Sequence, residues 1–482
     1  MGEMELELKR IDRWRWEIPM TGRMRVPGRV YASDALISDI RGDQSLRQVA
    51  NVACMPGIIG YSFAMPDIHF GYGFPIGGVA AMDTDEGLIS PGGVGYDINC
   101  GVRLVRTKLA EAEFAHRVGD MVKALFASVP CGVGSSGGIG TVSHAEERKI
   151  LTKGARWAVE RGMGSPGDLD HTEEGGCLAG ADAAAISERA ARRGSEQVGT
   201  LGSGNHFLEI AKVDEIFDER AAMAFGLWRG QLVLQIHCGS RGLGHQVCTD
   251  YIKTMLEAAR RYGLDLPDRQ LCAAPVKSDE GRRYFAAMAA AANYAWNNRQ
   301  VIMHLAVEAL ERALGISPRE LGAGLVWDVA HNIAKFETHT VDGVSRSVLI
   351  HRKGATRAFG PGHGGLPADY ATVGQPVLIP GDMGRQSFVC VGTDAAGETF
   401  ASTCHGAGRV MSRKAARGSA RGRDIVKELG KRGIHVMARG RGTVEEEMPD
   451  AYKDVAEVVG VMHEAGISSR VARLVPLGVV KG

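Results

Sequence analysis

Residues 66–101 read PDIHFGYGFPIGGVAAMDTDEGLISPGGVGYDINCG, and this stretch says most about the fold. Its short apolar runs alternate with glycine and proline, a pattern that is typical of strands joined by tight loops. Glycine makes up 65 of the 482 residues, roughly twice its usual share. So much glycine predicts many tight turns and many places where the backbone approaches a ligand or another strand.

The rest of the chain alternates predicted helices and strands. We expect helices at 110–128, 143–162, 186–194, 246–312, 410–432 and 453–465. We expect strands at 201–213, 230–242, from 347, within 374–383 and 385–392, and at the apolar end LVPLGVVKG. No linker-like tract or repeat divides the chain. The sequence therefore predicts one large α+β domain over residues 1–482, with mixed β-sheets flanked by helices.

The composition is that of a folded protein, with 44% hydrophobic and 23% charged residues and a net charge of +1. This balance excludes a global basic field, so a nucleic acid would have to bind a local patch. The nine cysteines are scattered, the opening MGEMELELKR has no signal-peptide core, and no run of 18 apolar residues occurs. We expect a cytoplasmic protein with reduced thiols and no membrane contact.

Several potential metal ligands stand next to glycine at predicted strand ends or loops. They are Asp97 and Cys100 in GGVGYDINCG, His206 in GSGNHF, His237 in QIHCGSRG, His331 in DVAHN and His405 in TCHGAGR. A thiolate, a carboxylate and several imidazoles form the donor set of a transition-metal site. Compact zinc spacings such as paired CxxC or HExxH are absent. Taken singly, each residue also fits a buried cysteine or a hydrogen-bonded histidine, so the pattern alone leaves both interpretations open.

Nucleotide-binding signals are weaker. GVGSSG (132–137) matches G-x-G-x-x-G but follows a poor strand, and no Walker loop occurs. HRKGATRAFGPGHGG carries Arg352, Lys353 and Arg357 among glycines. Cationic side chains and exposed backbone N–H groups favour anions, so this segment is either a phosphate-binding loop or an ordinary solvated basic loop.

Together these segments resemble the RtcB family of tRNA-splicing and RNA-repair ligases. The shared motifs are PDIHFGYGFPIGG, GGVGYDINCGVR, GSGNHFLEI, HCGSRGLGHQV, VAHN, HRKGATRA and CHGAGR followed by MSR, from about Asp67 to Lys481. The resemblance implies a GTP-dependent ligase with an RtcB-like fold. Such an enzyme joins RNA ending in a 2′,3′-cyclic phosphate or 3′-phosphate to RNA with a 5′-hydroxyl, as in tRNA splicing or RNA repair.

The resemblance also implies the site. Two Mn²⁺ ions would be held by Asp97, Cys100, His206, His237 and His331, with Cys100 bridging; softness alone would also permit Zn²⁺ or Co²⁺. His405 matches the nucleophile that attacks the α-phosphate of GTP and becomes guanylylated, and a neutral imidazole is a nucleophile near pH 7. The expected guanylate contacts are Asn205, His206, Phe207, Leu208, Glu209, His331, Asn332, Pro380, Gly381, Asp382, Met383, Ser387, His405, Gly406, Ala407, Gly408, Tyr452 and Lys481.

Within that set, the resemblance places Glu209 against guanine N1–H and N2–H, Lys481 against O6, and Tyr452 stacked on the base. The chain departs from the family at one turn, where Pro-Gly-Ser-Met is replaced by Pro-Gly-Asp-Met. An ionised Asp382 can accept hydrogen bonds from a ribose but cannot donate them. The expected phosphate-binding surface for RNA consists of Arg241, Arg352, Lys353, Arg357 and Arg409.

Two other functions stay open at this point. A dinuclear metal-dependent phosphoesterase would explain the metal ligands and the basic loop, but neither a guanylate site nor His405. A non-catalytic RNA-binding relative would need no nucleophile, and the near-neutral charge gives it no support. We expect a monomer. Archease, a small activating protein, is a partner of some family members, and the sequence does not say whether this chain needs it.

Overall fold

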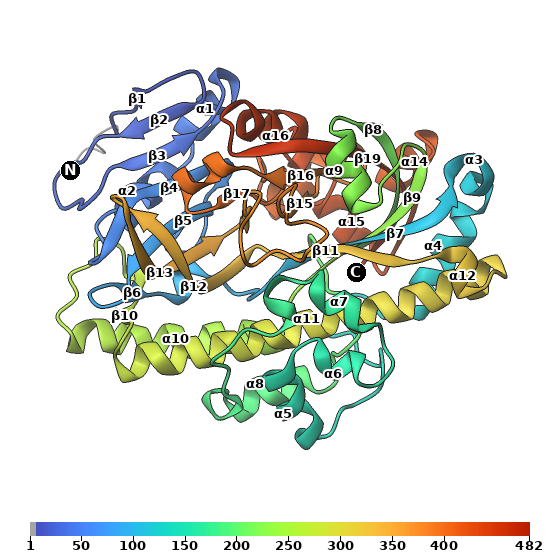
Figure 1. The fold of residues 1–482 in the computed structure, drawn as a ribbon, viewed down its shortest axis with the longest axis horizontal. Helices are drawn as coiled ribbons and strands as arrows, with labels where there is room; N and C mark the ends of the chain where they lie inside the picture. Colours follow the sequence, from blue (N-terminus) through green and yellow to red (C-terminus); the bar gives the residue numbers. More distant parts are fainter. Residues whose placement is uncertain (1–5) are drawn as a thin grey trace.

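The computed structural model describes residues 6–482, which fold around two large β-sheets (Figure 1). The first sheet has the order β1-β2-β3-β4-β5-β13-β12. Its strands are β1 (Lys9–Arg10), β2 (Arg15–Ile18), β3 (Gly28–Tyr31), β4 (Ile58–His69), β5 (Ile76–Asp83), β12 (Asn332–Val341) and β13 (Val344–Lys353). Only β3 and β4 pair in parallel within it.

The second sheet has the order β11-β7-β9-β8-β19-β16-β15, and β18 pairs with β19 in parallel. Its strands are β7 (Gly101–Ala110), β8 (Phe207–Ile216), β9 (Gln231–Cys238), β11 (Gly324–Ala330), β15 (Pro376–Ile379), β16 (Ser387–Gly392), β18 (His435–Ala438) and β19 (Ser468–Lys481). Two small sheets pair β6 (Leu88–Ile89) with β10 (Ala274–Pro275), and β14 (Ala355–Arg357) with β17 (Ser402–Cys404).

Helices flank these sheets. They are α1 (Asp34–Arg41), α2 (Ser45–Val52), α3 (Glu111–Phe114), α4 (Val118–Ser128), α5 (His144–Lys153), α6 (Arg156–Val159), α7 (Pro166–Asp170), α8 (Glu188–Gly194), α9 (Glu219–Phe225), α10 (Arg241–Arg261), α11 (Asp279–Leu314), α12 (Pro318–Leu321), α13 (Arg413–Ser419), α14 (Ile425–Lys431), α15 (Arg441–Glu446) and α16 (Val455–Glu464). The predicted α+β fold with mixed sheets is confirmed. The domain bounds 1–482 stay a prediction.

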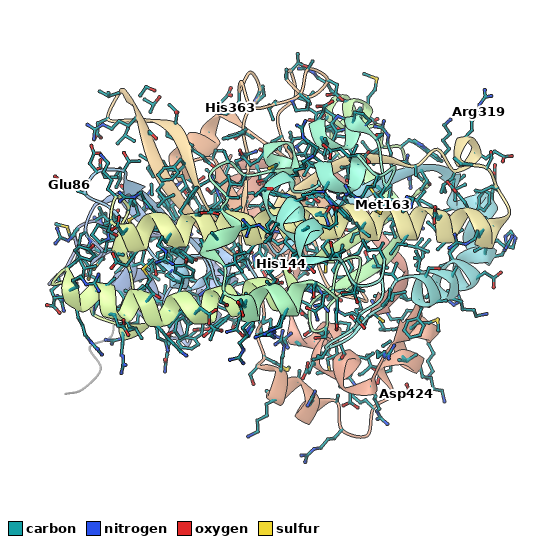
Figure 2. All side chains as sticks on the ribbon, turned by 90° about the horizontal axis from the view of Figure 1, so that it is seen from below. Glu86, His144, Met163, Arg319, His363 and Asp424 are labelled. Carbon is teal, nitrogen blue, oxygen red and sulfur yellow. The ribbon has the colours of Figure 1, made fainter. Side chains whose placement is uncertain are left out.

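The long helical region expected over 246–312 is two helices, α10 and α11, which lie side by side (Figures 1 and 2). Gly263 ends α10 because it adopts φ +62°, and the next N–H bonds back to the carbonyl of Ala259. The alanines of 287–292 are all buried, so that α11 can approach its neighbours closely.

The helix expected over 143–162 is also divided, into α5 and α6. Gly154 has φ +57°, and a Cβ there would lie 1.9 Å from the carbonyl oxygen of Gly176. The chain turns at this glycine because a larger residue would collide with the neighbouring backbone.

Both faces of the first sheet are covered, which explains the unbroken apolar run VAAM in β5. Ala80 and Met82 belong to the core that contains the alanines of α11, whereas Val79 and Ala81 belong to the core that contains α16. Alternate residues of a strand point to opposite faces, so a strand buried on both sides is apolar throughout. In the chain from residue 6 to 482, no helix is both long and apolar enough to cross a membrane.

Between β11 and β12 the chain passes from the second large sheet to the first within a single residue. β11 is an edge strand of the second sheet and β12 an edge strand of the first, and His331 alone separates them. The small β14–β17 sheet lies next to this crossing, since the N–H of Ala355 bonds to the carbonyl of His331. The predicted metal ligand therefore stands where three sheets meet.

Candidate active site

Strand register gathers the predicted ligands at the edge of the second sheet where its strands β11, β7, β9, β8 and β19 begin or end. Gly101 pairs with Ala330 on one side and Cys238 on the other. Phe207 pairs in the same way with His237 and Lys481. The residues flanking these pairs are Cys100, His206 and His331. The strand ends thus deliver these side chains to one place.

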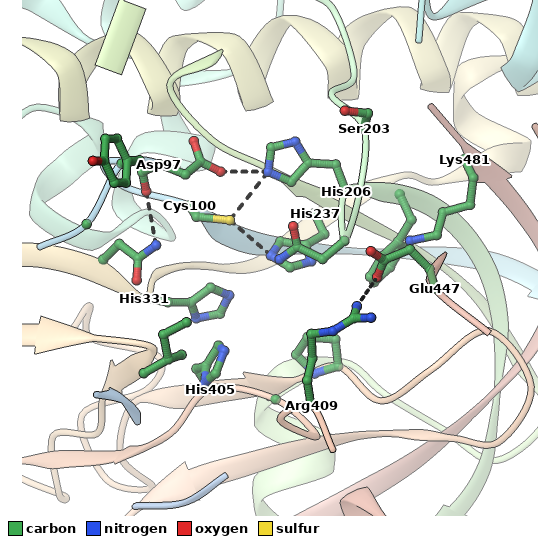
Figure 3. Close-up of a pocket in the computed structure, with 18 of the residues that line it drawn as sticks. Asp97, Cys100, Ser203, His206, His237, His331, His405, Arg409, Glu447 and Lys481 are labelled. Atoms are coloured by element: carbon green, nitrogen blue, oxygen red, sulfur yellow. Dashed lines mark hydrogen bonds and ion pairs between the residues drawn. The ribbon is translucent and has the colours of Figure 1, made fainter. Parts of the chain in front are cut away.

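A cavity of about 680 Å³ opens at this edge (Figure 3). The predicted site residues that line it are Asp97, Cys100, Asn205, His206, Phe207, Glu209, His237, His331, Asn332, Pro380, Gly381, Asp382, Met383, Ser387, His405, Gly406, Ala407, Gly408, Tyr452 and Lys481. Leu208 does not line it. Its side chain lies on the other face of β8, buried in the core beside Ile236 and Val480, so only its backbone can serve the cavity.

Four of the five predicted metal ligands are in contact. Sγ of Cys100 lies 3.5 Å from Nε2 of His206 and 3.2 Å from Nε2 of His237. Oδ2 of Asp97 lies 2.7 Å from Nε2 of His206. His331 stands beside this group, with its ring centre 5.4 Å from that of His237.

The donors present fit a metal centre. Nδ1 of His331 is hydrogen-bonded to the hydroxyl of Thr356 at 3.1 Å, which fixes the ring. Nε2 of the same ring is buried and has no hydrogen-bond partner among the described residues. A buried polar atom without a partner is costly, and a metal ion would satisfy it.

Charge in the cluster fits a cation as well. Burial lowers the pKa of His237 and of His331 well below its usual value, so both rings are neutral at pH 7, the form that binds metals. Burial would lower the pKa of His206 too, but the negative charge that Cys238, Asp97 and Cys100 carry when ionised outweighs it and raises that pKa well above the usual value. His206 therefore retains a proton, which a divalent cation would displace. Burial, helped by Asp97, raises the pKa of the Cys100 thiol to about 12.

The candidate nucleophile His405 follows β17 and is held by a carboxylate that sequence analysis did not identify. Oδ2 of Asp67 lies 2.5 Å from Nδ1 of His405 and accepts the backbone N–H groups of His405 and Gly406. Burial would raise the pKa of Asp67, but the His405 ring, these hydrogen bonds and Lys453 outweigh it and lower that pKa. Asp67 therefore stays ionised and occupies Nδ1, which leaves Nε2 of His405 for chemistry. Asp67 belongs to the motif PDIH, and nothing in the local sequence indicates that it contacts His405.

The predicted guanine contacts Glu209 and Lys481 are both buried. Glu209 accepts from the side-chain amide of Gln235 at 2.8 Å, and Lys481 donates to the carbonyl of Gly204 at 2.9 Å. Burial raises the pKa of Glu209 to about 8, with Asp382 adding to the shift, and burial lowers that of Lys481 to about 8. Two ionisable groups whose charged forms are both disfavoured suit a ligand that supplies hydrogen bonds to each.

Tyr452 is fixed at its hydroxyl. That group donates to the carboxylate of Glu447 and accepts from Arg409 at 3.1 Å, and Arg409 also forms an ion pair with Glu447 at 3.2 Å. The tyrosine ring is thus held at the cavity wall. Glu447 is buried and lines the cavity, and sequence analysis did not identify it because no motif surrounds it.

The unusual Asp382 is engaged within its own turn. Its carboxylate accepts the N–H of Gly384 at 2.9 Å and pairs with Arg385. Arg385 also donates to the carbonyls of Pro449 and Tyr452. Both carboxylate oxygens already have protein donors, so Asp382 ties the PGDM turn to the segment that carries Tyr452. Ser387, on the other side, accepts the N–H of Gly381 at 3.1 Å.

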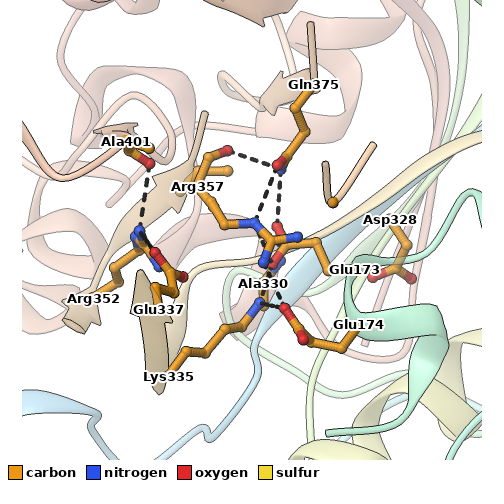
Figure 4. A network of polar contacts seen from close by, with 12 residues as sticks. Glu173, Glu174, Asp328, Ala330, Lys335, Glu337, Arg352, Arg357, Gln375 and Ala401 are labelled. Carbon is orange, nitrogen blue, oxygen red and sulfur yellow. Dashed lines mark hydrogen bonds and ion pairs between the residues drawn. The ribbon is translucent and has the colours of Figure 1, made fainter. Parts of the chain in front are cut away.

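The prediction that the basic loop binds phosphate is wrong for Arg352 and Arg357, and so is the solvated-loop alternative (Figure 4). Arg352 is fully buried and forms two hydrogen bonds with Glu337 at 2.5 and 2.8 Å. Arg357 is 5% exposed and bonds to Glu174 at 2.5 Å. Glu337, 15 positions away on the paired strand β12, neutralises Arg352, and Glu174, 183 positions away, neutralises Arg357.

The other predicted phosphate contacts lie at the cavity. Lys353 lines it but donates to the carbonyls of Tyr72 and Phe74, and burial lowers its pKa to about 7. Arg241 lines it as well, and its Nη2 bonds to the carbonyl of Gly132 at 3.3 Å. Exposed cations that the sequence did not single out, Arg193 and Arg413, lie at its rim.

Comparison with known proteins identifies the family. The family model described as tRNA-splicing ligase RtcB matches residues 48–482. The tRNA-splicing ligase RtcB of Thermococcus kodakarensis is 54% identical over 484 residues, which cover 100% of both chains. That of Archaeoglobus fulgidus is 54% identical over 482 residues, covering 99% of this chain and 100% of the relative. The RNA-splicing ligase RtcB of Mycobacterium tuberculosis is 52% identical over 437 residues, 90% of this chain and 100% of the relative. A match over nearly the whole chain, at this level of identity, means that the protein belongs to the RtcB family of RNA ligases.

Proposed function

We propose that this RNA ligase joins RNA ending in a 2′,3′-cyclic phosphate or 3′-phosphate to RNA with a 5′-hydroxyl, through a guanylylated His405. One observation carries the proposal: His405, held at Nδ1 by Asp67, shares a cavity with the metal donors and with buried Glu209 and Lys481. A phosphoesterase would need the metal donors but has no use for a buried carboxylate–lysine pair or for an anchored histidine.

In this proposal, Asp67 holds a proton on Nδ1, so that Nε2 of His405 carries the free electron pair. Nε2 attacks the α-phosphorus of GTP, the N–P bond forms, and the bond to the pyrophosphate oxygen breaks. A 2′,3′-cyclic end is first opened by water, which breaks the bond from phosphorus to the 2′ oxygen and leaves a 3′-phosphate and a 2′-hydroxyl. The GMP then passes to the 3′-phosphate of one RNA, which frees Nε2 again. Attack of the 5′-hydroxyl on this activated phosphate forms the new phosphodiester and releases GMP.

Two Mn²⁺ ions would be held by Asp97, Cys100, His206, His237 and His331. When bound, they would neutralise the triphosphate charge and polarise the phosphorus–oxygen bonds. The chain's own part is to present a thiol, a carboxylate and neutral imidazoles from a single sheet edge. The backbone of Gly406 and Gly408 would lie against the phosphates, since neither carries a side chain.

Guanine would be selected by Glu209 and Lys481. An ionised Glu209 accepts from N1–H and N2–H, and a protonated Lys481 donates to O6. The ring of Tyr452, held by Glu447 and Arg409, would stack on the base. The RNA would approach across the rim formed by the exposed Arg193 and Arg413. Action as a monomer and assistance by archease stay predictions.

The decisive experiment is incubation with α-labelled GTP and Mn²⁺, followed by denaturing electrophoresis. The wild-type protein should keep the label and His405→Ala should not. RNA that already carries a 3′-guanylylated end should be joined by His405→Ala, because the missing step is bypassed. Covalent GMP on the His405→Ala protein would refute the assignment. Failure of the wild-type protein to retain label would favour the phosphoesterase.

A further inference from the structure

The central helix α11 carries a polar run in a turn that is buried on all sides. Its sequence changes from AAMAAAANYAW to NNRQ at 297–300, and these four residues are fully buried. Buried polar side chains are costly unless they are hydrogen-bonded. The side chain of Asn297 has no such partner among the described residues, whereas its three neighbours do. Asn298 accepts the N–H of Gly199 at 2.8 Å, and Gln300 donates to Asp168 at 2.9 Å.

Arg299 in this run uses every donor of its guanidinium. Nη1 donates to the carbonyl of Asn99 at 2.7 Å and to that of Cys238 at 2.8 Å. Nη2 donates to the side-chain oxygen of Asn99 at 3.0 Å and to Asp328 at 2.7 Å, and Nε donates to Asp328 at 2.9 Å. The planar fork of an arginine can hold several acceptors in one fixed arrangement.

The acceptors of Arg299 adjoin three of the candidate metal ligands. Asn99 precedes Cys100, Cys238 follows His237, and Asp328 lies on β11, the strand that ends next to His331. One side chain thus binds the backbone on both sides of the Cys100–His237 contact. It approaches from behind the cavity, which it does not line.

Two local features show that the ligand loop is shaped around this arginine. Asn99 has φ +51°, a conformation that is rare for residues other than glycine. A Cβ on Gly101 would lie 3.1 Å from Cζ of Arg299 and 2.0 Å from the carbonyl oxygen of Val329. The glycine after Cys100 therefore lets the backbone lie between the guanidinium and β11.

We propose that Arg299 is a positioning residue of the metal centre. By binding the carbonyls of Asn99 and Cys238 together, it holds Cys100 against His237 before any metal arrives. The inference rests on the metal centre of the proposed function, and it assigns part of the metal affinity to a helix residue outside the cavity. Residues that orient metal ligands typically change metal affinity by about 10–100-fold when replaced.

The chain offers a matched control in Arg103. This arginine is equally buried and binds the same Asp328, with Nε 2.7 Å from Oδ2. Its remaining donors go to the side chains of Gln300, Met303 and Thr172, none of which adjoins a candidate ligand. Arg299→Lys and Arg103→Lys each keep a charge beside Asp328. Only Arg299→Lys loses the fork between the two carbonyls.

The test measures Mn²⁺ affinity of the full-length protein by equilibrium dialysis, and thermal unfolding of the metal-free protein. Both lysine variants should unfold at a lower temperature than wild type. Arg299→Lys should bind Mn²⁺ about 10–100-fold more weakly, whereas Arg103→Lys should keep the wild-type affinity. Equal weakening in the two variants, or unchanged affinity in Arg299→Lys, would overturn the inference.

A gentler variant covers the case in which Arg299→Lys does not fold. Asn99→Gly removes only the side-chain acceptor of Arg299 and accepts the left-handed backbone without strain. Both carbonyls that Arg299 holds remain, so its Mn²⁺ affinity should stay close to that of wild type. A loss as large as about 10–100-fold would assign the effect to the Asn99 side chain and overturn the inference. Absence of Mn²⁺ binding by the wild-type protein is a different failure, since it would refute the proposed metal centre itself.

Discussion

Oδ2 of Asp67 lies 2.5 Å from Nδ1 of His405, although 338 positions separate the two residues in the chain. Lys453 supports the pair from behind, because its ammonium donates to the carbonyls of Pro66 and Ile68 on either side of the aspartate. The carboxylate thus decides which nitrogen of His405 carries a proton, and its own place is set by a lysine from a third segment.

We expect Asp67→Asn to slow guanylylation by at least about 100-fold, the range in which a misplaced proton on a catalytic group commonly acts. An amide carries no negative charge and can turn its NH₂ toward the ring, which would favour the wrong tautomer. The initial rate of protein labelling by α-labelled GTP measures this. Mn²⁺ binding should persist, and the buried Asp168→Asn, outside the cavity, should label at the wild-type rate. Normal labelling of Asp67→Asn would show that the pair is only structural.

The sequence singled out the candidate metal donors and the candidate nucleophile, but not the residues that hold them. Cys100, His237 and His405 stand beside glycines at strand ends, a local signal that a linear reading can detect. Asp67 and Arg299 act through partners brought close only by the fold. Their roles follow from strand register and helix packing, and no spacing in the chain encodes either.

The prediction of a phosphate-binding loop was wrong because Arg352 and Arg357 are buried. Arg352 and Arg357 stand among glycines and look like an exposed basic loop. The buried Glu337 neutralises Arg352 and the exposed Glu174 neutralises Arg357, and only the folded chain reveals that these carboxylates are near. The division of the long helical region was also missed. A single glycine can occur within a helix, but Gly263 adopts a left-handed backbone conformation, and α10 ends there.

RNA affinity should depend on the exposed rim of the cavity. Replacing Arg193 and Arg413 with alanine should weaken RNA binding and flatten its salt dependence, because each phosphate neutralised on a single strand contributes about −0.7 to the slope. Binding measured against salt concentration gives the slope directly. The matched control is Lys277→Ala with Arg282→Ala, two exposed cations that do not line the cavity. Equal slopes in the two double variants would assign the RNA to another surface.

Nucleotide choice should depend on the end of the chain. Lys481 is 3% exposed, because β19 carries it between β8 and β18. Lys481→Met should raise the GTP concentration needed for guanylylation by about 10–100-fold, since a buried hydrogen-bond partner of guanine is lost. Wild-type protein should use ATP poorly, because adenine presents an amino donor to the lysine. Lys431→Met, at an exposed lysine, is the control. An unchanged requirement for GTP in Lys481→Met would place guanine elsewhere.

The last prediction concerns Glu209 and the pH dependence of stability. Burial raises the pKa of this carboxyl from 4.5 to about 8 in the folded protein, whereas the unfolded chain keeps the ordinary value. Between these two pH values the folded state therefore binds more protons than the unfolded state. Its contribution to stability is fully present below pH 4.5 and is lost as the pH rises toward 8.

Glu209→Gln should remove this loss, because glutamine does not titrate. The metal-free variant should gain stability over wild type as the pH rises from 5 to 8, by at least about 1 kcal/mol, since each tenfold change in proton affinity corresponds to about 1.4 kcal/mol. Urea unfolding at a series of pH values measures the difference, and titrations common to both proteins cancel. The series ends at pH 8 because Lys481, whose pKa is lowered to about 8, loses its charge above it, and that charge acts on Glu209 in the wild-type protein alone. Parallel stability curves would mean that Glu209 is already ionised in the folded protein.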